Sequence, residues 1–270
     1  MVQMGNADMP APAADAALLK IERQGAVLAV GLNRPAKRNA LNDGIILAIG
    51  ECFADLPDDI RAVVIHGLGD NFSSGLDLSE LRERDATEGL LHSQMWHRVF
   101  DRIQYSRVPV IAALKGAVIG GGLELACAAH IRVAEPSAYF ALPEGQRGIF
   151  VGGGGSVRLP RLIGVARMAD MMLTGRVYSA SEGSAYGFTQ YLVEDGGALN
   201  KAMELAGKIA GNAPLTNFAV LQALPMIAEA NPQTGLLMES LMATVAQSDQ
   251  EAKKRIRAFL DHKTAKVKPT

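Results

Sequence analysis

Three consecutive glycines at 120–122 constrain the fold of this chain more than any other feature of its sequence. Glycine loses more conformational freedom on folding than any other residue, so a run of glycines is unfavourable inside a helix or a strand. Here the run follows the apolar segment 108–116 and comes just before Glu124. This pattern predicts a buried strand, a tight turn, and a short helix that starts near Gly121 and carries Glu124 in its first turn.

The chain alternates between strand and helix patterns in its first half and is mainly helical in its second half. Of its 270 residues 49% are hydrophobic and 20% are charged, which is enough for a substantial core. The fold class predicted from this order is α/β, with a trailing helical region. The predicted strands lie within 18–32 (a hairpin), 61–67, 108–116, 130–134 and 139–142, and the predicted helices cover 41–56, 87–105, 123–129 and most of the chain from 156 to 263.

We divide the chain into three parts. Residues 1–17 are interpreted as a flexible leader, 18–200 as the core with the active site, and 201–270 as a C-terminal helical region. The leader has no basic stretch followed by an apolar core, so no signal peptide is predicted. No apolar run reaches the roughly 18 residues that a membrane span requires, so no membrane association is expected.

Charge and cysteine content narrow the function classes. The formal net charge is −1 and no block of basic residues precedes the last few positions, which disfavours nucleic acid as a partner. Cys52 and Cys127 lack CxxC spacing and are interpreted as free thiols, so a cytoplasmic location is expected. His92 and His97 are five residues apart, which misses the spacing of a helical zinc pair, and no metal site is predicted.

Familiar glycine motifs are absent from the sequence. No glycine cluster ends in the G-K-[ST] of a phosphate-binding loop, no G-x-G-x-x-G opens a helix after the first strand, and no G-x-S-x-G nucleophile elbow occurs. Two similar strand–glycine–helix segments remain, F-S-S-G-L-D-L at 72–78 and the glycine run itself. Backbone N–H groups at a helix start have no intrahelical acceptor, and two of them aimed at one point would form an oxyanion hole.

Two acids accompany these segments. Glu124 follows the glycine run, and Glu144 lies 20 residues later in F-A-L-P-E-G. Taken singly, Glu124 is explained by the helix dipole, which favours a carboxylate in the first turn, and Glu144 by an ordinary loop position. Taken together beside two candidate oxyanion donors, they indicate general acid/base chemistry on a carbonyl compound.

Four segments in this order and spacing resemble the crotonase superfamily, whose best-known members are the enoyl-CoA hydratases. The segments are N-R-P-A-K-R-N-A-L-N (33–42), F-S-S-G-L-D-L (72–78), A-A-L-K-G-A-V-I-G-G-G-L-E-L-A (112–126) and A-L-P-E-G-Q-R-G (141–148). The resemblance covers roughly residues 18–263. It implies a ββα spiral core followed by a C-terminal helical oligomerisation region, and a homotrimer or a dimer of trimers.

The resemblance also implies roles for individual residues. The backbone N–H groups of Leu76 and Gly121 would bind the thioester oxygen of an acyl-CoA. Glu144 would supply the Cα proton while Glu124 helps to activate water. The substrate is carried as a coenzyme A thioester, and no further cofactor is expected.

The CoA moiety would contact two loops. The residues implied are Ser74, Gly75, Asp77 and Leu78 in one loop and Ala36, Lys37 and Arg38 in the other. Lys37 and Arg38 either contact a phosphate of CoA or are simply solvated cations of the loop, and the sequence does not distinguish the two interpretations. The backbone of Gly152 would help to orient the catalytic water, or the second glycine cluster serves only close packing of the next helix.

Retention of both acids favours hydration of a trans-2-enoyl-CoA. The alternatives are another crotonase activity, such as an enoyl-CoA isomerase or a specialised CoA-ester lyase, and a non-catalytic interaction protein. The near-neutral charge and the paired acids disfavour the interaction protein.

Several residues depart from the common family pattern and leave the acyl group open. Leu76 is bulkier than the frequent alanine, Ser79 replaces a frequent lysine, and Val151 replaces a frequent proline. Arg147 follows Glu144 closely and is expected to lower its pKa and weaken it as a proton donor. His130 replaces a frequent aspartate and is interpreted as structural.

Overall fold

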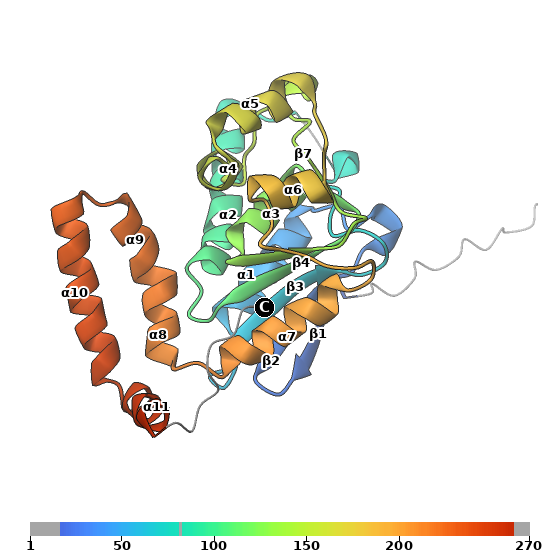
Figure 1. The fold of residues 1–270 in the computed structure, drawn as a ribbon. Helices are drawn as coiled ribbons and strands as arrows, with labels where there is room; N and C mark the ends of the chain where they lie inside the picture. Colours follow the sequence, from blue (N-terminus) through green and yellow to red (C-terminus); the bar gives the residue numbers. More distant parts are fainter. Residues whose placement is uncertain (1–16, 81–82, 262–270) are drawn as a thin grey trace, which may run out of the picture.

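A six-stranded and a three-stranded β-sheet, surrounded by helices, form the body of the protein, and a group of C-terminal helices projects from it (Figure 1). The structure is a computed structural model and describes residues 17–80 and 83–261. The predicted leader therefore lies almost wholly outside the described residues, and the division of the chain into three parts stays a prediction.

The larger sheet has the strand order β1-β2-β3-β4-β6-β9. Its strands β1 and β2 pair antiparallel, and all its other pairs are parallel. The smaller sheet has the order β5-β7-β8. The strands are β1 (Leu19–Gln24), β2 (Val27–Leu32), β3 (Ala62–Gly67), β4 (Val110–Leu114), β5 (Ala117–Ile119), β6 (Ile131–Ala134), β7 (Tyr139–Ala141), β8 (Tyr178–Ser179) and β9 (Tyr191–Leu192).

Helices cover both faces of the larger sheet and build the C-terminal part. They are α1 (Asp43–Ala54), α2 (Ala86–Gln104), α3 (Gly121–Ala128), α4 (Gly155–Ile163), α5 (Val165–Thr174), α6 (Ala180–Tyr186), α7 (Ala198–Ala210), α8 (Pro214–Phe218), α9 (Leu224–Glu229), α10 (Pro232–Ser248) and α11 (Gln250–Leu260). Short 3₁₀ turns lie at η1 (Pro35–Lys37), η2 (Leu78–Glu80) and η3 (Gly145–Arg147), and a π-helical turn, η4 (Ala219–Ala223), joins α8 to α9.

The central strands are buried on both faces because two separate cores use their alternate residues. Along β3, Val63 and Ile65 pack into the main core with α1 and α2, whereas Ala62 and Val64 face α7 on the other side. Parallel strands covered on both faces read as continuous apolar runs. This explains why 61–67 and 108–116 were recognisable as buried strands from the sequence.

The predicted elements agree with the structure except for short strands and one helix start. Helix α1 begins at Asp43 and not at 41, because the Asn42 side chain caps it by accepting a hydrogen bond from the Ile45 N–H at 3.0 Å. The strands β5, β8 and β9 have two or three residues each. Such strands are too short for a period of two to register in the sequence.

An ion-pair cluster around Asp77 joins the loop after β2 to the loop before η2. The buried Asp77 carboxylate accepts hydrogen bonds from Arg34 at 2.8 Å and from Lys37 at 3.0 Å, and Ser79 donates to it through its N–H and its hydroxyl. These contacts, with the hydrogen bond from the Ser79 hydroxyl as the largest cause, hold the pKa of Asp77 well below its usual range. The buried Asn39 adds side-chain hydrogen bonds from the same loop to the Leu68 and Asn71 carbonyls.

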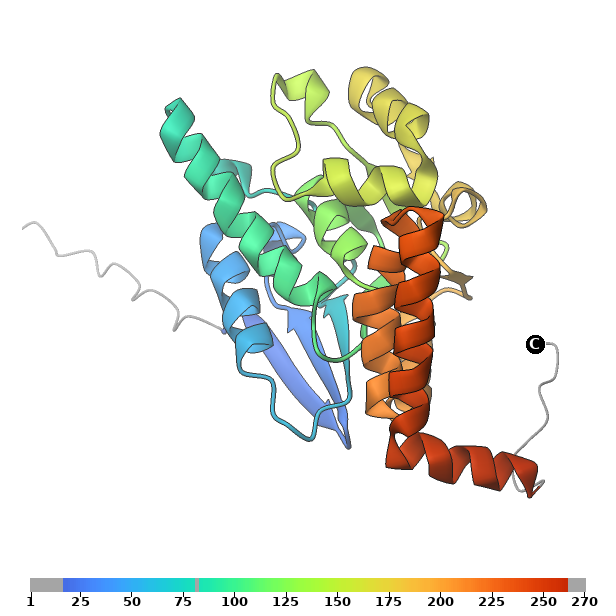
Figure 2. The same ribbon diagram turned by 90° about the vertical axis from the view of Figure 1, so that its left-hand side faces the viewer.

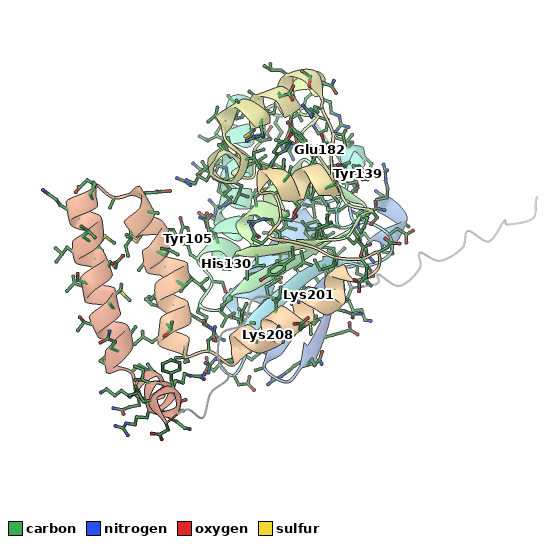
Figure 3. All side chains as sticks on the ribbon, viewed as in Figure 1. Tyr105, His130, Tyr139, Glu182, Lys201 and Lys208 are labelled. Atoms are coloured by element: carbon green, nitrogen blue, oxygen red, sulfur yellow. The ribbon has the colours of Figure 1, made fainter. Side chains whose placement is uncertain are left out.

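The helices α8 to α10 form an antiparallel hairpin that stands away from the sheets, and α11 turns off from its end (Figures 1 and 2). Figure 3 places Tyr105 and His130 at the edge of the body that faces this hairpin. His130 bridges two elements there, because its Nδ1 accepts from the Val110 N–H at 2.9 Å and its Nε2 contacts the Gln104 carbonyl at 3.0 Å. These bonds agree with the structural role expected for His130.

Many apolar side chains of the hairpin remain exposed. They include Leu224, Met226, Leu236, Leu237 and Leu241, each more than half exposed. None of the helices within the described ranges combines the length and the apolarity needed to cross a bilayer.

Replacing Asp77 by asparagine tests the ion-pair cluster. We expect Asp77→Asn to lower the free energy of unfolding by about 1–3 kcal/mol, because a neutral amide would face cationic and hydroxyl donors at a buried site. The control Asp59→Asn removes the exposed pair with Arg23 and should change the free energy of unfolding much less, because solvent screens a surface pair. Urea denaturation of the two variants measures both values, and equal losses would contradict a special role for the Asp77 cluster.

Candidate active site

Each of the three consecutive glycines is required by a different neighbour. Gly120 has φ +51°, and a Cβ atom there would lie 2.5 Å from Oε1 of Glu144. A Cβ atom at Gly121 would lie 2.8 Å from the Trp96 ring, and one at Gly122 would lie 2.7 Å from Ser73. Since real Cβ atoms do not approach other atoms so closely, the run allows a helix start to pack against an acid, an indole and a strand at once.

The backbone pairing at Leu76 turns its N–H group away from the neighbouring strand segment. Leu41 donates to the Gly75 carbonyl at 2.7 Å and accepts from the Asp77 N–H at 2.8 Å, in a parallel bridge to Leu76. In such a bridge the middle residue points its own N–H to the opposite side. Among the described residues, the N–H of Leu76 therefore has no acceptor.

The second unpaired donor, the N–H of Gly121, lies close to the first. Gly121 is the first residue of α3, so its N–H has no acceptor within the helix. A Cβ atom at Gly75 would lie only 3.4 Å from the Gly121 nitrogen, which puts the two predicted oxyanion donors side by side. The structure thus brings Leu76 and Gly121 together, and their joint role as an oxyanion hole stays a prediction.

Glu124 lies at the base of the site and is held by backbone donors. Its Oε1 accepts hydrogen bonds from the N–H groups of Gly153 and Gly155, each at 2.8 Å. Burial raises the pKa of Glu124, and these bonds together with the nearby Arg158 offset the rise only in part. The second glycine cluster therefore positions this carboxylate, and a Cβ atom at Gly155 would lie 2.9 Å from its Oε1.

Glu144 is the second buried acid. Its Oε2 is buried and has no hydrogen-bond partner among the described residues. Burial, the largest cause, and the neighbouring Glu124 together raise the pKa of Glu144 to about 7. Arg147 lowers the pKa as expected from the sequence, but its influence is smaller than that of burial. The sequence showed Arg147 but not the burial that outweighs it, because the depth of a side chain is set by the tertiary structure.

A cavity of about 380 Å³ joins these groups. Of the residues predicted from the sequence, it is lined by Ser74, Gly75, Leu76, Leu78, Gly121, Glu124, Glu144 and Gly152. Asp77 lies outside the lining because its side chain is engaged in the ion-pair cluster. Ala36, Lys37 and Arg38 also lie outside it, and Lys37 is bound to Asp77 and Ser79.

Several residues of the site were not singled out from the sequence. Trp96 and Ser93 line the cavity from α2, and the Ser93 hydroxyl donates to the Gly152 carbonyl at 2.7 Å. The buried Arg158 donates to the Gly153 carbonyl at 2.9 Å and to Asp101 at 2.6 Å, which fixes the glycine loop behind Glu124. The glycine cluster itself was the available signal for this loop. The side-chain contacts of Ser93 and Arg158 left no signal in the sequence, because they join residues far apart in the chain.

Within 17–80 and 83–261, no three or more histidine, cysteine or acidic side chains are grouped so that they could hold a metal ion. The donors present are backbone N–H groups, and the ionisable groups are two carboxylates. This set is suited to stabilise a developing oxyanion and to move protons.

Comparisons with known proteins agree with this geometry. A family model described as enoyl-CoA hydratase/isomerase matches residues 22–269. A short-chain-enoyl-CoA hydratase of Clostridium acetobutylicum is 33% identical over 89% of this chain and 94% of its own length. A 2,3-dehydroadipyl-CoA hydratase of Escherichia coli is 35% identical over 93% of this chain and 98% of its own length.

Solved structures show the same fold. A crystal structure from Rhodopseudomonas palustris, described as a candidate enoyl-CoA hydratase, has a TM-score of 0.90 and 80% identity, covering 95% of this chain and all of that one. An enoyl-CoA hydratase of Bacillus anthracis has a TM-score of 0.85 and 29% identity, covering 91% of this chain and 96% of that one. From the match of the family model over most of its length and from these relatives, the chain belongs to the enoyl-CoA hydratase/isomerase family, the crotonase superfamily.

Proposed function

We propose that this protein is an enoyl-CoA hydratase, a lyase that adds water syn across the double bond of a trans-2-enoyl-CoA. The observation that carries the proposal is one cavity lined by two buried carboxylates with raised pKa values and by two unpaired backbone N–H groups. The curated relatives named as hydratases support it.

The geometry suggests how the residues divide the work. The thioester oxygen would lie between the N–H groups of Leu76 and Gly121, where the negative charge that develops in the transition state is stabilised by about 3–4 kcal/mol per donor. Glu124, oriented by Gly153 and Gly155, takes a proton from water as its oxygen attacks Cβ. Glu144 gives a proton to Cα. No cofactor beyond the CoA carrier is needed for these steps.

The proton balance of this mechanism is simple. Before the reaction Glu144 carries one proton and Glu124 carries none, and after the reaction the positions are exchanged. The two carboxylates therefore share one proton in total, both for hydration and for the reverse dehydration. The raised pKa of both groups keeps that proton on the enzyme near neutral pH.

A panel of enoyl-CoA thioesters of different length and branching tests the proposal directly. Loss of absorbance of the conjugated thioester, followed by identification of the 3-hydroxyacyl-CoA product, would support hydration. If the protein left crotonyl-CoA and longer 2-enoyl-CoAs unchanged but shifted the double bond of a 3-enoyl-CoA, it would be an isomerase and the proposal would be wrong.

We expect Glu124→Gln and Glu144→Gln each to reduce kcat at least about 100-fold, because each removes one proton-transfer group. Binding of a saturated acyl-CoA should persist, since the backbone donors are unchanged. Steady-state kinetics and calorimetric titration measure the two effects. Unchanged turnover in either variant would contradict the assigned role.

The pH dependence should follow the protonation of the carboxylate pair. We expect kcat/KM for hydration to fall as the pH rises through about 7, where the pair loses its proton. It should fall again at acid pH, where both groups are protonated. Dehydration should show the same profile because the reaction consumes no net proton. A hydration rate that stays constant between about pH 6 and 8 would contradict this prediction.

We also infer that the protein forms a homotrimer or a dimer of trimers and works in the cytoplasm. The exposed apolar side chains of α9 and α10 support self-association, since such patches are unusual on a monomer. Cys52 and Cys127 are both free, which suits a reducing compartment.

The double variant Leu237→Glu/Leu241→Glu tests the self-association. The two leucines are four residues apart on one face of α10, so we expect charges there to shift the protein to smaller species. Gln233→Glu on the same helix, at an exposed polar position, should leave the assembly unchanged. Light scattering after gel filtration measures the masses, and a monomeric unmodified protein would contradict the proposal.

A further inference from the structure

Two arginine side chains in the wall of the cavity take no part in the reaction described above. Arg84 precedes α2, and Arg147 lies in η3, three residues after Glu144. Both line the same cavity as the catalytic pair. We propose that these two guanidinium groups bind a carboxylate at the far end of the acyl chain, so that the preferred substrate is the CoA ester of an unsaturated dicarboxylic acid. The inference deepens the proposed function and rests on it.

Among the described residues, neither guanidinium group has a hydrogen-bond partner, although Arg147 lies close enough to Glu144 to lower its pKa. In the part of the chain that the structure describes, the side chains of Arg84 and Arg147 make no hydrogen bond, ion pair or ring contact. Other arginines near the site are engaged: Arg34 binds Asp77, and Arg158 binds Asp101 and the Gly153 carbonyl. A guanidinium group offers five N–H donors in a planar arrangement that matches a carboxylate.

Helix α2 forms one wall of the cavity and runs from the end where the reaction takes place to the far end. Trp96 contacts Gly121, so it marks the level of the thioester oxygen. With a rise of 1.5 Å per residue, Gly89 lies about 10 Å further along the helix, and Arg84 lies beyond the helix start. Figure 2 shows that this end of α2 extends past the sheets. Arg84 is therefore placed for the end of a chain and not for the reacting atoms.

The lining between the two ends is mainly apolar on the opposite wall. Ile149 and Phe150 follow Arg147 in the loop after η3, and all three line the cavity. Methylene groups would pack on these side chains. Of the other charged or titratable lining residues, His92 is bound to Asp43 at 2.7 Å, and the two glutamates are the catalytic pair. An anion at the far end of the cavity would thus meet Arg84, whereas the two acids of the lining are the catalytic pair.

The anion could in principle be a phosphate of CoA itself. The two sources differ in what they predict, because every substrate has the CoA phosphates but only some have a second carboxylate. A pair of substrates that differ only in the terminal group separates them. The first pair is trans-2-hexenoyl-CoA, called the neutral substrate, and the six-carbon trans-2-enoyl-CoA whose acyl chain ends in a carboxylate. The second pair consists of the corresponding eight-carbon thioesters.

The variants Arg84→Gln and Arg147→Gln test the proposal, with Arg98→Gln as the matched control. Arg98 lies on the exposed side of α2, outside the cavity lining. We expect the unmodified protein to prefer the carboxylated member of at least one pair. Each cavity variant should lower kcat/KM for that substrate by about tenfold or more, the size expected for a charged hydrogen bond, mainly through KM. Arg84→Gln should lower kcat/KM for the substrate without a terminal carboxylate less than about twofold, and Arg98→Gln should change neither substrate. For Arg147→Gln the readout is the ratio of kcat/KM between the two substrates, because Arg147 also acts on the pKa of Glu144.

Salt provides a second measurement. Attraction between a partly exposed guanidinium group and a carboxylate is screened, so kcat/KM for the carboxylated substrate should fall more steeply with ionic strength than that for the neutral one. The difference in slope should disappear in the double variant Arg84→Gln/Arg147→Gln.

Two outcomes would overturn the inference. Equal losses on the neutral and carboxylated substrates would assign the arginines to the CoA phosphates. Preference for the neutral members, with no effect of either variant, would show that the arginines bind no part of the substrate. Dissociation constants of the saturated six-carbon acyl-CoA and its carboxylated counterpart give the same comparison without turnover. Failure of hydration alone would therefore contradict the proposed function, whereas failure of the binding preference would contradict this inference.

Discussion

The burial of two carboxylates in one cavity is the constraint on which the rest of the site depends. An ionised acid is expensive to remove from water, so each group must be neutralised, hydrogen-bonded or both. Glu124 receives two backbone N–H groups from the second glycine cluster, whereas one oxygen of Glu144 has no partner among the described residues. The different surroundings of the two acids suit different tasks, an oriented base and a proton donor with a pKa near neutrality.

This arrangement explains why both glycine clusters are needed. The first allows α3 to start within reach of Glu144, Trp96 and Ser73, and it makes Gly121 the first residue of α3, whose N–H has no acceptor within the helix. The second brings backbone donors within 2.8 Å of Glu124, where a side chain would not fit. The glycines are thus close-approach positions, and their entropic cost is offset by the packing of the elements that surround them.

Much of the fold and part of the site could be predicted from the sequence. The buried strands and the long helix α2 have clear apolar patterns, and Leu76, Gly121, Glu124 and Glu144 follow motifs whose spacing is local. The short strands could not be predicted, because two or three residues show no periodicity. The direction in which the pKa of Glu144 shifts could not be predicted either, since Arg147 is visible in the sequence and the depth of burial is not.

The sequence by itself determined the element order, the helix start at the glycine run and the two acids, because these depend on residues within a few positions of one another. Only the tertiary structure decided which groups meet. The engagement of Asp77 with Lys37 and the meeting of Arg84 and Arg147 in the lining of one cavity depend on residues far apart in the chain. The position of the glycine loop depends on the packing of Arg158 against Asp101 in the same way. Such contacts leave no local pattern, since their geometry is set by how the sheets and helices pack.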